Sequence, residues 1–226
     1  MDLPKNLHLI PQTTSVRALI TTLRDKSTRS QEFRHNASRL GELLAAQVLA
    51  NQPVHTAAFA LSPTGECTDA AVLKGSQALV PILRAGQALV GPFERFMSDP
   101  SIWHVGVSRG HETLKPTQYF CAVPEKIVAV IDHPGFLDTH CYVLDPMLAT
   151  GGSAEYVVRL LKARGAKRIT FAGIIGAPEG VKFLHEQHPD VDIYLAVLDR
   201  CLNEKGYILP GLGDFGDRYF NSGPLL

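Results

Sequence analysis

The chain has 226 residues, of which 45% are hydrophobic and 19% are charged, which is the balance of an ordinary globular protein. Its 22 basic and 22 acidic residues cancel. This neutrality argues against a general binder of nucleic acid or of anionic membrane surfaces, because both need a basic excess. Any anionic substrate must therefore be held by a local positive site.

The sequence contains no apolar run of the length that a transmembrane helix needs and no signal pattern near Met1. Four cysteines lie far apart and form no CxxC pair, which favours free thiols in a reducing compartment. We therefore expect a cytoplasmic protein with one domain spanning residues 1–226.

The first fifty residues are predicted to be helical. A short helix is expected at 17–24 and a longer one at 31–50, with Ser30 as its N-cap. The longer segment carries apolar residues at spacings of three and four, which is the period of one helix face. These residues are Phe33, Ala37, Leu40, Leu44 and Val48.

From residue 54 the pattern changes to short apolar runs separated by turns. Several runs are continuous, as expected for strands that are covered on both faces. The expected strands are 54–61, 78–83, 102–107, 127–131, 142–144, 169–175 and 191–198. The expected helices between them are 86–97, 153–164 and 179–187. This alternation predicts an α/β fold with a parallel sheet and a ligand at the carboxyl ends of its strands.

The segment 142–164 is typical of a phosphate-binding unit. An apolar strand leads into Asp145, and a turn then leads into a helix. In this turn Gly151 and Gly152 allow backbone amides to approach a ligand, and the hydroxyls of Thr150 and Ser153 flank them. The helix N-terminus adds unpaired N–H groups and partial positive charge. Together they predict a monophosphate cradle.

Other motif interpretations are weaker. No GxxxxGK[ST] P-loop is present. A GxGxxG pattern occurs at 211–216, but no following helix is predicted, and too few residues remain for a ribose-binding acid. His185 with His188, and a polar cluster at 132–140, are interpreted as a solvated helix end and a turn rather than metal sites.

The segment 143–153 closely resembles the motif by which uracil phosphoribosyltransferases bind phosphoribosyl pyrophosphate (PRPP). Segment 80–86 is similar to the family's pyrophosphate loop, and Arg109 with 112–116 to its mobile active-site loop. Segment 206–218 resembles its uracil-binding signature. The resemblance covers nearly the whole chain and implies the type I phosphoribosyltransferase fold, in which a mainly parallel sheet is flanked by helices. It divides the single domain into a helical segment (about 1–50), a core (about 54–200) and a base-binding region (about 201–226).

The resemblance also implies roles for individual residues. Asp145 should bind the ribose hydroxyls, and 149–153 the 5′-phosphate. Arg84 and Arg109 should neutralise the pyrophosphate, while Asp214 should reach PRPP or its metal. Arg84, Arg109, Asp145 and Asp214 are thus the expected catalytic residues. The expected PRPP-binding residues are these four together with Pro146, Met147, Leu148, Ala149, Thr150, Gly151, Gly152 and Ser153. The backbone of Gly213, Asp214 and Phe215, beside Ile208, should bind uracil. Mg²⁺ is the expected cofactor, arriving with PRPP.

Three departures from the family pattern stand out. Phe215 occupies a position where the family usually has a small residue, so its ring is expected to narrow the base pocket or to stack on the base. Ser108, Gly110 and His111 replace the usual neighbours of Arg109. The segment between Tyr119 and Asp145 is about nine residues longer than the resemblance leads us to expect, which predicts an extra hairpin at 127–142.

The sequence therefore predicts transfer of the phosphoribosyl group of PRPP to uracil, giving UMP and pyrophosphate. Two alternatives stay open: a phosphoribosyltransferase with a different base preference, and a PRPP- or nucleotide-sensing protein that has lost the chemistry. The resemblance implies a homodimer or larger homo-oligomer, with GTP as an effector in some relatives. Neither a nucleic acid polymer nor a membrane is expected as a partner.

Overall fold

The structure is a computed structural model that describes residues 3–50, 52–56, 61–66, 71–73, 75–109, 116–127 and 139–223. Within these residues nine strands form the main sheet: β1 (Leu7–Leu9), β6 (Ser76–Leu83), β7 (Ser101–Ile102), β8 (Val105–Arg109), β9 (Pro116–Cys121), β10 (Thr139–Leu144), β11 (Met147–Leu148), β12 (Arg168–Gly176) and β13 (Asp192–Leu198). The helices are α1 (Thr14–Arg24), α2 (Ser30–Leu49), α3 (Gln87–Glu94), α4 (Gly152–Ala163), α5 (Pro178–Gln187) and α6 (Phe215–Phe220).

The sheet has the order β1-β13-β12-β10-β6-β8-β9, in which β7 also pairs with β6 and β11 with β12. All pairs are parallel except β8 with β9, which are antiparallel. The predicted α/β fold with a parallel sheet is therefore confirmed. Because the strands are parallel, the loops that follow β6, β8 and β10 all leave from the same edge.

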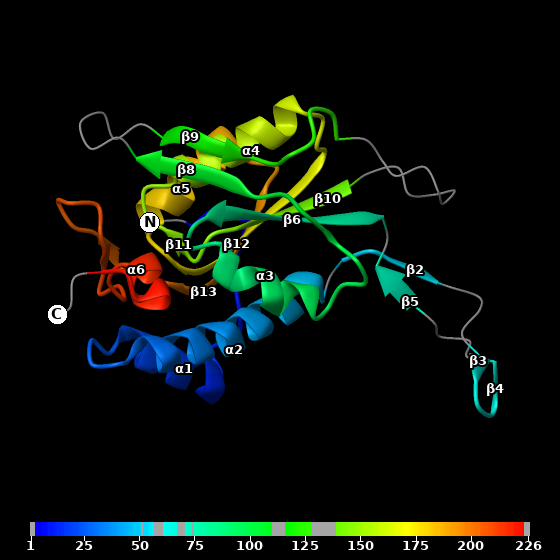
Figure 1. Ribbon diagram of the computed structural model, residues 1–226, viewed down its shortest axis with the longest axis horizontal. Helices are drawn as coiled ribbons and strands as arrows, with labels where there is room; N and C mark the ends of the chain where they lie inside the picture. The colour runs from blue at the N-terminus through cyan, green and yellow to red at the C-terminus, as the bar shows by residue number, and fades with distance from the viewer. Residues whose placement is uncertain are drawn as a thin grey trace.

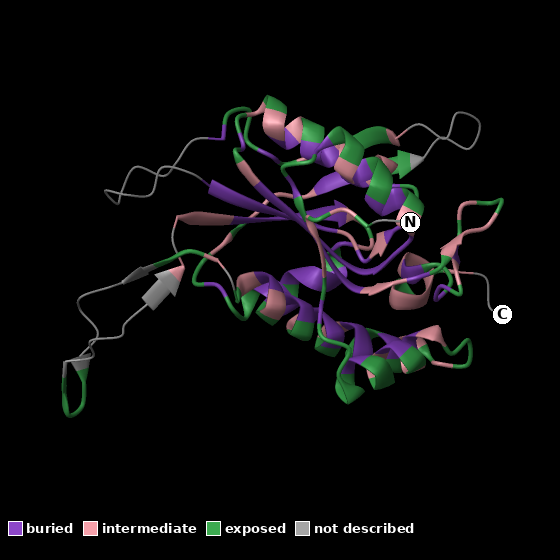
Figure 2. Ribbon diagram, turned by 180° about the vertical axis from the view of Figure 1, so that it is seen from behind, coloured by how far each residue is buried: buried purple, intermediate pink, exposed green. Residues whose placement is uncertain are grey.

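Helices cover both faces of the sheet (Figure 1). One layer contains α1, α2 and α3, with α6 beside α2, and the other contains α4 and α5. Each layer encloses its own cluster of buried side chains, so the central strands are buried from both sides (Figure 2). All six residues of β10 are buried, which explains the continuous apolar pattern in the sequence. None of the helices in the described ranges has the length and apolar character needed to cross a membrane.

Four short strands form two ribbons outside the main sheet. They are β2 (Val54–Thr56) with β5 (Ala71–Leu73), and β3 (Leu61–Ser62) with β4 (Gly65–Glu66), and both pairs are antiparallel. They extend away from the body of the molecule at the right of Figure 1. The expected core strand at 54–61 is therefore wrong, because its described part lies in the ribbons. An apolar run that begins with the half-exposed Val54 does not distinguish a ribbon from a core strand.

Three local predictions also need correction. Ser30 is the first residue of α2 rather than its cap, which is Arg29. A six-residue helix, α6, follows Asp214, where none was predicted. The predicted hairpin at 127–142 lies mostly outside the described residues, but its last four residues, 139–142, belong to the central strand β10, which is parallel to both neighbours.

A histidine is buried in this central strand. His140 is only 4% exposed, its ring stacks on Tyr142 with centroids 4.1 Å apart, and its Nε2 lies 2.9 Å from Thr170 Oγ1. Burial, together with the smaller effect of the charge of Arg168, lowers the pKa of His140 to about 3. The side chain is therefore neutral in the folded protein at neutral pH.

We predict that His140 makes the protein acid-sensitive. Below a pH of about 6.5 the unfolded chain binds a proton at this residue that the folded chain excludes, so the free energy of unfolding falls as the pH drops toward 3. Between pH 7.5 and pH 5, His140→Phe should therefore gain stability relative to the wild type by about 1–2 kcal/mol. Urea unfolding at the two pH values measures this difference.

Thr170→Val is the control, because it removes the same hydrogen bond but keeps the imidazole. The difference in the free energy of unfolding between Thr170→Val and the wild type should change little with pH. If the difference for His140→Phe were also independent of pH, His140 would not be the cause of the acid sensitivity.

Candidate active site

The loops after β6 and β10 lie side by side at the carboxyl edge of the sheet. Arg84 follows β6, and Asp145 follows β10. Gly86 fits tightly against the end of β10, because a Cβ at this position would lie 2.2 Å from the carbonyl oxygen of Leu144. The structure therefore brings together the predicted pyrophosphate loop and Asp145 of the predicted PRPP motif.

The turn after Asp145 is fixed to the sheet by backbone hydrogen bonds. The carbonyl of Pro146 accepts from the N–H groups of Ile174 and Ile175, at 3.0 and 2.9 Å, and the carbonyl of Leu148 accepts from Ala177 N at 2.9 Å. Asp145 is half-buried, and its Oδ1 accepts from Met147 N at 3.3 Å. This network holds the start of α4 in one place relative to the sheet.

The two glycines of the predicted cradle are required for different physical reasons. Gly151 has φ +83°, and a Cβ there would lie 2.9 Å from Gly180 O, so the fold itself requires glycine. A Cβ on Gly152 would meet nothing closer than Thr150 Oγ1, at 4.0 Å. The protein leaves open space at Gly152, in front of a helix N-terminus that no side chain caps. Such a site suits an anion.

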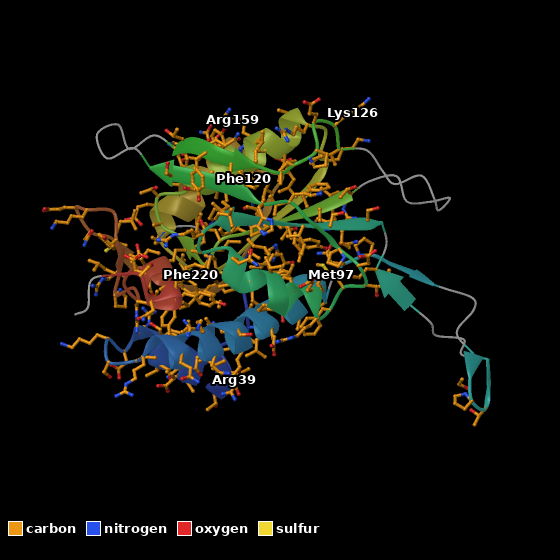
Figure 3. All side chains as sticks on the ribbon, in the orientation of Figure 1. Arg39, Met97, Phe120, Lys126, Arg159 and Phe220 are labelled. Atoms are coloured by element: carbon orange, nitrogen blue, oxygen red, sulfur yellow. The ribbon has the colours of Figure 1, made fainter. Side chains whose placement is uncertain are left out.

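Arg84 reaches from the pyrophosphate loop to the C-terminal segment. Its side chain is 60% exposed and lies 3.5 Å from an oxygen of Asp217. Its Nη1 also donates to Ser222 Oγ at 3.3 Å, and its guanidinium lies 5.8 Å from the ring centroid of Phe220, which is labelled in Figure 3. An arginine this accessible, held by one carboxylate, has donors available for a phosphate.

Asp217 and Arg218 are adjacent in the sequence but have different partners, since Asp217 pairs with Arg84. Arg218 instead donates to three backbone carbonyls, at Leu23, Leu212 and Asp25, and lies over the ring of Phe33 at 4.4 Å. Burial lowers the pKa of Arg218, an effect that the negative charge of Asp25 opposes, but an arginine keeps its charge in proteins.

A short hairpin packs beside the cradle. It consists of β14 (Cys201–Leu202) and β15 (Ile208–Leu209), which are antiparallel. Leu202 N donates to Glu179 Oε1 of α5 at 2.9 Å. A Cβ on Gly206, in the hairpin turn, would lie 3.7 Å from the Thr150 methyl carbon. The base-binding region expected from the sequence therefore adjoins the phosphate cradle.

The residues expected to bind uracil follow this hairpin. Gly213 and Asp214 are exposed, while Ile208 is buried. Asp214 is the N-cap of α6, and its Oδ1 accepts from Asp217 N at 2.8 Å. A helix therefore does begin at the end of the GxGxxG pattern, although none was predicted. The pattern still does not resemble a dinucleotide-binding unit, because the strand before it, β15, belongs to a two-stranded antiparallel ribbon with β14 and not to the parallel sheet that the structure describes.

The ring of Phe215 is buried, unlike the neighbouring Gly213 and Asp214, which are exposed. It is 1% exposed and packs edge-on against Phe33 of α2, with centroids 5.1 Å apart, and against Tyr219 at 5.6 Å. The expectation that this ring narrows the pocket or stacks on the base is therefore wrong. A bulky residue is accommodated here because its side chain belongs to the core.

Arg109 is the last residue of β8 and lies at the same edge of the sheet as Arg84, because β8 is parallel to β6. Its side chain and residues 110–115 lie outside the described residues, as does the neighbouring His111. Its expected role stays a prediction.

Sequence reasoning missed a buried ion pair beneath the base-binding segment. Both oxygens of Asp199 accept from Arg24, at 2.5 and 2.8 Å, and one of them also accepts from Gly211 N at 2.8 Å. Arg24 donates in turn to Gly211 O at 2.7 Å. No local sequence pattern links these residues, because the two partners lie 175 positions apart.

A protein-only metal cage is not part of this arrangement. Among the described residues, no group of three or more His, Cys, Asp or Glu side chains is placed to hold a metal ion. Asp145 and Asp214 are two of the carboxylates on these loops, and oxygen donors of this kind fit an ion such as Mg²⁺, which keeps water and phosphate ligands and takes few from the protein.

A parallel α/β sheet with a strand–turn–helix unit after β10, an adjacent arginine loop and a C-terminal hairpin beside them is the arrangement of a type I phosphoribosyltransferase fold. The family model described as uracil phosphoribosyltransferase matches residues 10–222. The chain belongs to the uracil phosphoribosyltransferase family.

Known proteins of this kind resemble the chain over nearly its full length. It is 43% identical over 203 residues to the uracil phosphoribosyltransferase of Pediococcus pentosaceus, which covers 90% of this chain and 92% of the relative. It is 41% identical over 220 residues to that of a Roseiflexus species, covering 95% and 98%. A solved structure of an Aquifex aeolicus protein, 27% identical, superposes with a TM-score of 0.83 over 97% of this chain and all of that one.

We predict that Gly152→Val blocks the cradle without unfolding the protein. Its side chain would occupy open space needed by the 5′-phosphate, so PRPP affinity should fall at least about tenfold, while thermal unfolding changes little. Calorimetric titration with PRPP and a melting curve measure the two effects.

Gly151→Ala is the matched comparison, since it introduces a Cβ at a positive φ and against Gly180 O. It should lower the melting temperature. Unchanged PRPP affinity in Gly152→Val would place the phosphate elsewhere.

Proposed function

We propose that this chain transfers the phosphoribosyl group of PRPP to uracil, giving UMP and pyrophosphate in pyrimidine salvage. The observation that carries the proposal is the family match over 10–222, on a chain that keeps an open cradle at Gly152. In the reaction the bond from C1′ to pyrophosphate breaks, the bond from C1′ to uracil N1 forms, and N1 loses its proton.

The residues at the sheet edge have distinct tasks in this proposal. Backbone amides at the start of α4 bind the 5′-phosphate. The carboxylate of Asp145 accepts hydrogen bonds from the ribose hydroxyls. Arg84, together with Arg109, neutralises the pyrophosphate, whose negative charge grows as it leaves.

No covalent nucleophile is needed. The ribosyl centre becomes oxocarbenium-like, as in glycoside hydrolysis, and the protein's contribution is to position two substrates and to stabilise charge. In the chain, the anchored turn after Asp145 and the adjacent arginine loop provide both.

Uracil recognition is assigned to the backbone at 213–215, beside Ile208. A planar base with fixed N–H and C=O edges is well matched by rigid backbone groups, and the glycines allow a close approach. The burial of the Phe215 ring against α2 supports uracil over an altered base preference, because the ring does not reduce the space beside Gly213.

We further propose that Mg²⁺ arrives bound to PRPP, with Asp214 or Asp145 within reach. When bound, the ion would neutralise charge on the pyrophosphate. A homodimer or larger assembly and a GTP effector stay predictions from the resemblance. Size-exclusion chromatography tests the first, and UMP assays with and without GTP test the second.

The defining experiment is incubation of the protein with Mg²⁺, PRPP and uracil. UMP and pyrophosphate should form in equal amounts. A parallel panel of cytosine, xanthine, guanine and orotate should give little product. Turnover of one of these bases without UMP would replace uracil as the substrate, and PRPP binding without turnover of any base would favour a sensor.

We predict that Arg84→Ala lowers kcat/KM by about 100-fold or more, because the residue stabilises the leaving group. Steady-state kinetics of UMP formation measure this loss. Arg95→Ala is the matched control: Arg95 is equally accessible, at 61%, but pairs with Glu42. A near-normal rate for Arg84→Ala would remove this residue from the site.

A further inference from the structure

Two arginines fix the backbone that leads into the base-binding residues. Gly211 is held on both sides, because Arg24 donates to its carbonyl at 2.7 Å and its N–H donates to Asp199 at 2.8 Å. The next carbonyl, of Leu212, accepts from Arg218 at 2.7 Å. Arg218 also donates to carbonyls of Leu23 and Asp25, so it ties this loop to the end of α1, which lies below α6 in Figure 1.

These bonds set the direction of the free backbone groups. A peptide unit is planar and trans, so its N–H points opposite to its C=O. Since the Leu212 carbonyl points at Arg218, the N–H of Gly213 must point away from it. Gly213 is exposed, and no acceptor in the described residues receives this N–H. A carbonyl oxygen on the edge of a planar base is a suitable acceptor.

The pair beneath this loop is unlike the surface ion pairs of the molecule. Asp199 is 4% exposed and Arg24 is 24% exposed, whereas Arg159, paired with Glu155 on α4, is 60% exposed. Burying an ion pair contributes little net stability, and its better-attested use is to select one geometry. The backbone at Gly211 is restricted to one geometry as well, because it has φ +69° and a Cβ at this position would lie 2.1 Å from Ile208 O.

We propose that Arg24 and Asp199 are positioning residues that fix the backbone at Gly211, which leads into the base-binding residues 213–215, and thereby set the affinity for uracil. This inference rests on the proposed function. Within the described residues, the hydrogen bonds of the pair run to Gly211 and to the end of β12, where Asp199 N donates to Gly176 O at 2.8 Å, and none runs to the cradle or to the arginine loop. Substitution of either residue of the pair should therefore leave PRPP binding unaffected.

The test compares the KM values for the two substrates in Arg24→Lys and Asp199→Asn. Lysine keeps the charge but lacks the planar fork, and asparagine keeps one acceptor oxygen but loses the charge. Each variant should raise the KM for uracil about tenfold or more, because small displacements of a binding group have large effects, with the KM for PRPP within about twofold.

Arg164→Lys is the control variant. Arg164 also donates to backbone carbonyls, at Val123 and Pro124, but it lies at the end of α4 far from its N-terminus. Both KM values should stay close to those of the wild type. A melting curve for each protein shows whether it is folded.

An equal rise in both KM values, or no rise in either, would overturn the positioning role. Failure of both variants to fold would do the same, because the pair would then be structural. A different result would reject the proposed function: the absence of UMP formation by the wild-type protein, whatever the KM values of the variants.

Discussion

The geometry of the site depends on the backbone bonds between the carbonyl of Pro146 and β12. They fix the point at which the chain leaves β10, turns through Gly151 with its positive φ, and enters α4. A helix N-terminus attracts an anion only where its N–H groups are exposed and held still. The buried β10 strand and the anchored turn provide both conditions, and the arginine loop and hairpin are packed around this fixed point.

The second constraint is the contact between the N-terminal helices α1 and α2 and the C-terminal segment 211–220. Arg24 from α1 and Arg218 from α6 each donate to carbonyls of the segment 211–212, and Phe215 inserts its ring against α2. The N-terminal helices thus do more than cover one face of the sheet. They also support the segment 211–215, so that the turn before α4 is held by the sheet and the proposed base-binding backbone by the helices.

Much of this arrangement was accessible from the sequence because its signals are local. Apolar runs predicted the central strands, and the glycines with flanking hydroxyls predicted the cradle between β10 and α4. Apart from local errors such as the strand at 54–61 and the Ser30 cap, the features that were missed involve contacts distant in sequence. The pairing of Arg84 with Asp217, the burial of Phe215 and the pair between Arg24 and Asp199 each join segments that lie more than a hundred residues apart. The short α6 was missed because six residues give too little periodicity.

The exposed contact of Arg84 with Asp217 has a consequence for how a leaving group would be received. A solvent-exposed ion pair contributes only about 0–1 kcal/mol, so an incoming polyanion replaces the carboxylate at little cost. Meanwhile Ser222 and the ring of Phe220 already restrict the side chain. The weak pair with Asp217 therefore orients the guanidinium before an anion binds and is easily displaced by it. This orientation lowers the conformational entropy that Arg84 loses on binding.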